Sequence, residues 1–174
     1  DNFKKGAIYD PDYQAILNYW ISKGWALPTL SNQIAGNNFV IALKAAGIWI
    51  KLRFLYPCRV GTGGGVDIAC TDWKTPSDAT NMTRVNSPTF VAGSGFTMNG
   101  TTNYLDLNYD PSTGANWEFD SAHIACYEYL NVANGTGIDV NSTGENRLMG
   151  RTPTNLFRGR INQDSSNQES ATIV

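Results

Sequence analysis

The chain has 174 residues, a length that is typical of one domain or of one domain with a short appendage. Only 16% of the residues are charged, the net charge is -2 and no segment concentrates basic residues, which argues against nucleic-acid binding through a positive surface. The longest apolar run covers residues 45–50 and is far shorter than the ~20 residues of a membrane-spanning helix, so we expect no membrane insertion.

The first fifty residues carry the hydrophobic spacing of α-helices. The pair Asp10-Pro11 predicts the start of a helix that runs to Gly24, since Asp is a good N-cap and Pro fits the first helical position. Ser31 predicts the start of a second helix that ends at Gly47. Its expected apolar positions are Ile34, Phe39, Leu43 and Ala46. Helices this short need a sheet or another subunit to cover their apolar stripes.

From Phe54 onward the hydrophobic period changes to about 2, which is typical of β-strands. The clearest strand covers residues 103–109, and Asn99-Gly100 predicts a hairpin turn that joins it to a strand at 96–98. Further strands are expected at 67–73, 122–130, 138–141, 147–150, 156–161 and 171–174.

Many short strands at roughly regular spacing predict a β-sandwich or jelly roll. The expected domain organisation is a helical anchoring segment at residues 1–53, followed by a mainly β jelly-roll sandwich at 54–174. Residues 171–174 have the pattern of an entering strand without a closing turn. We therefore expect the sandwich to be incomplete here, and either to continue beyond Val174 or to be completed by another chain.

Few residues have catalytic potential. His123 and Cys126 would lie on opposite faces of a strand, which does not favour a nucleophile pair. Glu118 and Asp120 have the alternating spacing of glycosidase carboxylates, but no second acidic cluster accompanies them. We expect no catalytic residue, no metal and no cofactor. The cysteines fit no metal-ligand spacing and are expected to be buried free thiols; they are Cys58, Cys70 and Cys126.

Two tryptophans are the candidate ligand-binding residues. Trp73 and Trp117 border loops, whereas Trp20 and Trp49 lie in helical stripes that favour burial. Exposed indole rings line many small-molecule and sugar sites. Trp73 and Trp117 are therefore the positions at which we expect contact with a carbohydrate.

Several stretches resemble a module of tailed-phage virion proteins. They are V-N-S-P-T-F at 85–90, G-F-T-M-N-G at 95–100, Y-L-D-L-N-Y-D-P at 104–111, helical stretches at 13–17 and 43–52, and the region 147–162. The resemblance implies a concanavalin A-like jelly roll and a non-enzymatic structural protein of the virion, as a fibre, spike or capsid decoration. The implied partners are other virion proteins, copies of the same chain in a homotrimer, and cell-surface glycan.

The sequence also leaves open a function outside the virion, in carbohydrate binding or hydrolysis. The chain could be a secreted carbohydrate-binding module or a glycoside hydrolase of jelly-roll type. In that case Glu118 and Asp120 would carry the hydrolysis. Cleavage of a polysaccharide that is lost in Glu118→Gln would separate the enzyme from the structural protein.

Overall fold

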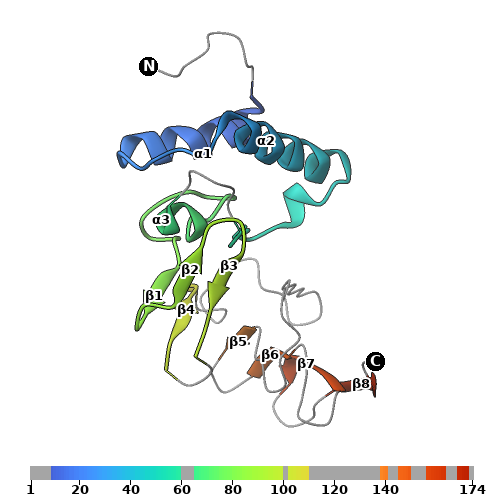
Figure 1. The fold of residues 1–174 in the computed structure, drawn as a ribbon. Coiled ribbons are helices and arrows are strands. Elements are labelled where there is room, and N and C mark those ends of the chain that lie inside the picture. The colour runs from blue at the N-terminus through green and yellow to red at the C-terminus, as the bar shows by residue number, and fades with distance from the viewer. Residues whose placement is uncertain are drawn as a thin grey trace. The chain divides into compact units, whose positions relative to one another are not determined.

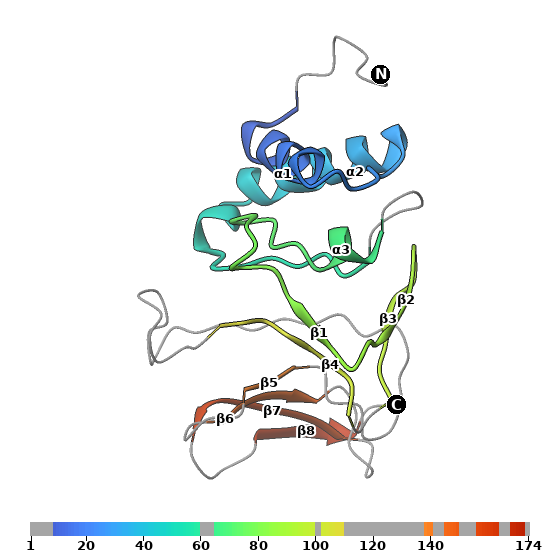
Figure 2. The ribbon, with the colours of Figure 1, turned by 90° about the vertical axis from the view of Figure 1, so that its left-hand side faces the viewer.

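The computed structural model describes residues 9–59, 65–99 and 102–109, together with the backbone of four strands between residues 138 and 172. The chain forms two compact units, residues 1–109 and 110–174. In the first unit, helices α1 (Pro11–Ser22) and α2 (Leu30–Ala45) lie side by side at one end, and the short helix α3 (Val66–Ala69) lies between them and four short strands (Figures 1 and 2). The expected boundary at residues 53 and 54 lies inside this unit.

Helix α1 forms where the sequence predicts it. The Asp10 carboxylate accepts a hydrogen bond from the N–H of Asp12 at 3.0 Å, and Pro11 occupies the first helical position. The helix ends at Ser22, and Gly24 follows with a φ of 69°, a conformation that glycine adopts without strain. Local capping signals therefore determine both ends of this helix.

Helix α2 confirms the second predicted helix but presents a different face to the core. Ile34 and Phe39, which the apolar spacing predicts to be buried, are exposed. The buried positions of α2 are Gly36, Asn37 and Val40. The missing side chain of Gly36 is the physical reason, since a Cβ atom there would lie only 2.7 Å from the Tyr13 ring of α1. The two helices approach closely because this position is a glycine.

Polar contacts join the start of α1 to the middle and the end of α2. The Oδ1 atom of Asn37 accepts a hydrogen bond from the Asp10 N–H at 2.7 Å, which explains why a polar side chain is buried here. The Lys44 ammonium contacts the carboxylates of both Asp10 and Asp12. Burial acts to raise the pKa of Asp10, but the hydrogen bonds from Lys44 and from the Asp12 N–H outweigh it and hold that pKa below its ordinary value.

Aromatic rings form the centre of the first unit. Trp20 is completely buried, and its Nε1 donates a hydrogen bond to Thr71 Oγ1 at 3.0 Å. Trp73 meets Trp20 edge-on at a centroid distance of 6.0 Å and meets Tyr13 edge-on at 5.5 Å. Ile68 and Ala69 of α3 complete the cluster. The core therefore joins the N-terminal helices to a segment about fifty residues further along the chain.

The prediction of a strand at residues 67–73 is wrong, because this segment forms α3 and a turn. Asp72 within it is buried, and its carboxylate accepts hydrogen bonds from the N–H groups of Leu55 at 3.0 Å and Lys74 at 2.9 Å. Burial raises the pKa of Asp72 above its ordinary value, against the lowering effect of these hydrogen bonds. Side-chain acceptors thus bind backbone N–H groups that a sheet ladder would otherwise use.

The hairpin predicted at Asn99-Gly100 is also wrong. Strand β1 (Thr83–Val85) pairs with β4 (Tyr104–Asp106), whereas β2 (Thr89–Val91) pairs with β3 (Gly95–Thr97), both antiparallel. The rings of Phe90 and Phe96 face each other across the second pair at 5.0 Å. The strands on either side of Asn99 therefore belong to different two-stranded sheets.

The second unit contains one described sheet. Strands β5 (Ile138–Val140), β6 (Glu145–Met149), β7 (Leu156–Gln163) and β8 (Gln168–Thr172) pair antiparallel in that order. Predicted strands at 138–141, 147–150 and 156–161 agree with β5, β6 and β7. The strand predicted at 122–130 lies outside the described residues.

These sheets do not form the predicted concanavalin A-like jelly-roll sandwich. A jelly roll packs two antiparallel sheets of several strands each face to face. Within the described residues of the first unit, the strands are three residues long and form two separate pairs beside two long helices. The described sheet of the second unit is a meander. In the first unit, strands of three residues are too short for the long ladders that a sandwich needs.

Candidate functional site

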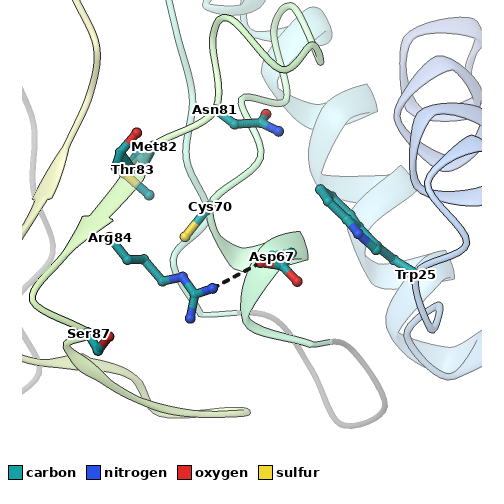
Figure 3. Close-up of a pocket in the computed structure, with 8 residues that line it drawn as sticks. All are labelled: Trp25, Asp67, Cys70, Asn81, Met82, Thr83, Arg84 and Ser87. Carbon is teal, nitrogen blue, oxygen red and sulfur yellow. Dashed lines mark hydrogen bonds and ion pairs between the residues drawn. The ribbon is translucent and has the colours of Figure 1, made fainter.

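A pocket of about 380 Å³ opens on the surface of the first unit. It is lined by Trp25, Asp67, Cys70, Asn81, Met82, Thr83, Arg84 and Ser87. These residues come from the loop between α1 and α2, from α3, and from β1 with its flanking turns. Figure 3 shows Trp25 on the side opposite Arg84, Cys70 and Met82, with Asp67 between them. The volume is within the range of small-molecule sites, roughly 300–1,000 Å³.

The charged part of the pocket is the ion pair between Arg84 and Asp67. The guanidinium Nη2 atom lies 3.2 Å from Asp67 Oδ1, and the two side chains are 37% and 50% exposed. A guanidinium carries five N–H donors. Among the described residues, the ion pair with Asp67 uses the Nη2 atom of Arg84, so other donors remain for a ligand. The pair therefore offers hydrogen-bond donors and acceptors side by side, with no net charge.

The inner wall of the pocket is apolar. Cys70 is a buried free thiol, and Met82 beside it is also buried. Burial raises the pKa of Cys70 to about 12, with Arg84 opposing this shift. A nucleophilic cysteine needs a lowered pKa, so Cys70 acts here as a small apolar surface.

The opposite wall is the indole of Trp25. Tyr19 meets this ring nearly at a right angle, with centroids 5.7 Å apart. Tyr19 is itself held by hydrogen bonds to the carboxylate of Asp78 at 2.8 Å and from the Asn81 amide at 2.7 Å. A perpendicular contact covers at most one face of the indole. Trp25, half-buried, therefore presents a fixed aromatic surface to the pocket.

The rim of the pocket includes a strained turn. Asn86 and Ser87 both have a positive φ, 52° and 51°. This conformation is uncommon for serine and is further disfavoured at Ser87 because Pro88 follows it. The Asn86 amide holds the turn by donating a hydrogen bond to the carbonyl of Thr102 at 2.7 Å. Such strain is costly and concentrates at ligand sites, so the turn is consistent with a binding role for the rim.

The chemistry of this pocket is suited to binding. It combines the aromatic wall of Trp25, the apolar inner wall of Cys70 and Met82, and the ion pair of Arg84 and Asp67, whose charges cancel. The Cys70 thiol is protonated at neutral pH, because burial raises its pKa. Within the described ranges, no three His, Cys, Asp or Glu side chains come together as a metal site would require.

The structure places the predicted ligand residue Trp73 in the core, where it is 6% exposed and packed against two aromatic rings. Trp117 lies outside the described residues. The same holds for Glu118, Asp120, His123 and Cys126. Trp25 and Arg84 line the pocket although the sequence does not predict them as site residues. The position of Trp25 in a proline-containing loop between two predicted helices is the sequence feature that points to it.

A second surface feature is an apolar row on α2. Leu30, Ile34 and Ile41 are exposed, and at 3.6 residues per turn they lie within about 40° of one another around the helix. We call these three residues the α2 stripe. The charged residue of α2 is Lys44, and it is engaged with Asp10 and Asp12. Among the described residues of the first unit, the α2 stripe is therefore an uncharged apolar surface whose side chains are 45–49% exposed.

Comparison with family models, with curated proteins and with solved structures gives no match to this chain. Among the described residues, no helix combines the length and the apolar character that crossing a membrane requires.

Proposed function

We propose that this chain is a non-enzymatic structural protein of a virion that works by assembling with copies of itself and with other virion proteins. The α2 stripe is the observation that carries the proposal. The sequence resemblance to tailed-phage virion proteins supports it, although the jelly roll implied by that resemblance is not what the described residues form.

The spacing of the α2 stripe favours contact with another helix. Ile34 and Ile41 are seven residues apart and Leu30 precedes Ile34 by four, which is the spacing of one side of a coiled-coil interface. The intervening position of this spacing is Asn37, which is buried and accepts a hydrogen bond from the Asp10 N–H. Single exposed apolar residues are common on protein surfaces, whereas several on one side of a helix favour an interaction surface. The stripe therefore fits the side of a second apolar helix.

A second copy of the same chain is the partner that the charge pattern favours. An interface between identical subunits brings the same residues close together around the symmetry axis, so charges there would repel one another. The α2 stripe contains no charge, and the nearby Lys44 is neutralised by two carboxylates. Three copies, as in a fibre, are the expected assembly.

The assembly is tested by sedimentation velocity over a range of protein concentrations. We expect the unmodified chain to reach three times the chain mass of 19.0 kDa. Ile41→Lys should raise the dissociation constant by about tenfold or more, because it places like charges in an apolar contact.

Phe39→Lys is the matched control. Phe39 and Ile41 are on the same helix and are both 45% exposed, but Phe39 lies about 160° away around the helix. Equal dissociation by both variants would reject the α2 stripe as the interface. A chain that remains monomeric at every concentration would reject the assembly altogether.

The location in a virion needs a separate measurement. We expect mass spectrometry of purified particles from the source material to find this chain in a constant ratio to the major structural proteins. Its absence from particles, while the chain is present in the unfractionated material, would contradict the proposed location.

A further inference from the structure

We infer that the pocket between Trp25 and Arg84 binds a neutral pyranose unit of a surface polysaccharide. This inference rests on the proposed location of the chain in a virion, and it goes beyond that proposal by naming a class of ligand. The indole, the ion pair and the strained rim carry it together.

The ion pair selects a neutral ligand with adjacent hydroxyl groups. One sugar hydroxyl can donate a hydrogen bond to Asp67 while its neighbour accepts one from Arg84, so both charged groups keep a partner. A carboxylate ligand would gain from Arg84 but would face the negative charge of Asp67 only 3.2 Å from the guanidinium. The zero net charge of the lining therefore disfavours an acidic sugar.

The apolar walls fit the remaining surface of a pyranose. One side of the sugar ring consists of C–H groups, and the Trp25 indole provides a rigid apolar surface for them. Cys70 and Met82 line the opposite side together with Arg84 (Figure 3). A pocket with aromatic and apolar walls and a few convergent polar groups matches a ligand that is apolar on one side and polar at its edge.

The rim supplies a further polar group in a fixed position. Ser87 lines the pocket, and its backbone is held in a disfavoured conformation by the turn that includes Asn86. This arrangement keeps the Ser87 residue at the pocket wall without a rearrangement on binding, which lowers the entropy lost when a ligand binds.

Binding is tested with the full chain and three probes, by NMR titration that follows the indole N–H signal of Trp25. The probes are methyl β-D-glucopyranoside, methyl β-D-galactopyranoside and the methyl glycoside of N-acetylneuraminic acid. We expect at least one neutral probe to shift this signal and the acidic probe to leave it unchanged. Arg84→Met should raise the dissociation constant of the neutral probe by about tenfold or more, because the probe loses its hydrogen bonds to the charged guanidinium. Trp25→Leu removes the indole and therefore identifies its N–H signal in the spectrum.

Lys51→Met is the control for the charge change in Arg84→Met, because it removes one exposed positive charge. It should bind the neutral probe as the unmodified chain does. Binding of the acidic probe alone, binding of none of the probes, or unchanged binding in Arg84→Met would each overturn the inference.

The same samples separate this inference from the proposed assembly. Ile41→Lys should alter the assembly mass without changing the Trp25 titration, and Arg84→Met should do the reverse. A pocket that fails to bind neutral sugars, in a chain that still assembles through α2, would remove only the pyranose site.

Discussion

Trp20→Ala is expected to lower the free energy of unfolding by about 3–5 kcal/mol, the largest effect of any substitution considered for this chain. Trp20 is completely buried, contacts Trp73 edge-on and donates its Nε1 hydrogen bond to Thr71. Alanine removes the ring contact and leaves a cavity between α1 and α3. Urea titration followed by helical circular dichroism measures the change.

Two further variants separate the contributions at this position. Thr71→Val keeps the shape of the side chain but leaves the Trp20 N–H without its acceptor, which should destabilise the protein by about 1–3 kcal/mol. Ile50→Ala is the surface control, since Ile50 is 84% exposed and its change should stay within about 0.5 kcal/mol. A loss of less than 1 kcal/mol in Trp20→Ala would contradict the observed core.

Gly36→Ala is expected to destabilise the protein by about 1–3 kcal/mol, although the same change in an exposed helix stabilises it by about 1 kcal/mol. The added Cβ would lie 2.7 Å from the Tyr13 ring. Tyr13 has little room to move, because it packs edge-on against Tyr9 at 5.6 Å and against Trp73 at 5.5 Å. The helices must therefore separate to accept the methyl group. Urea titration gives the sign of the effect directly.

A double-mutant cycle identifies the cause. In a Tyr13→Leu background the ring is absent, and Gly36→Ala should become neutral or stabilising. Asn38→Ala is the control on the exposed side of the same helix and should gain slightly in stability. If Gly36→Ala stabilised the unmodified chain, the close approach of α1 and α2 at this glycine would be disproved.

The elements set by local signals are predictable from the sequence. The start of α1 follows from Asp10 and Pro11, and its end follows from Gly24, because caps act within one turn of the helix. Strands β5, β6 and β7 likewise agree with their predicted positions, since alternation and flanking turn residues are read within a few positions.

The face of α2 and the segment 67–73 could not be predicted in this way. Apolar spacing points to Ile34 and Phe39 as core residues, yet Gly36 is buried because of a ring on another helix. A short, mainly apolar segment such as that from Val66 to Cys70, which contains one charged residue, fits a strand or a helix equally well, and periodicity does not distinguish them. Non-local packing decides both cases.

The candidate site depends on non-local contacts as well. Trp25 and Trp73 both border loops, but only the folded chain shows that Trp73 packs against Tyr13 and that Trp25 lines a pocket. Arg84 and Asp67 are 17 residues apart and belong to a strand and a short helix. No motif connects them, so their ion pair becomes visible only in the structure.

The hydrogen bond between Trp20 and Thr71 joins residues 51 positions apart, which has a consequence for biosynthesis. Ribosomes add about 5–20 residues per second, so Thr71 is made about 3–10 s after Trp20. During that interval the emerging helix pair has an indole without its acceptor and an apolar side that α3 cannot yet cover. We expect the nascent chain to be most prone to chaperone capture or aggregation in this window, which ends when residues 68–73 emerge from the ribosome.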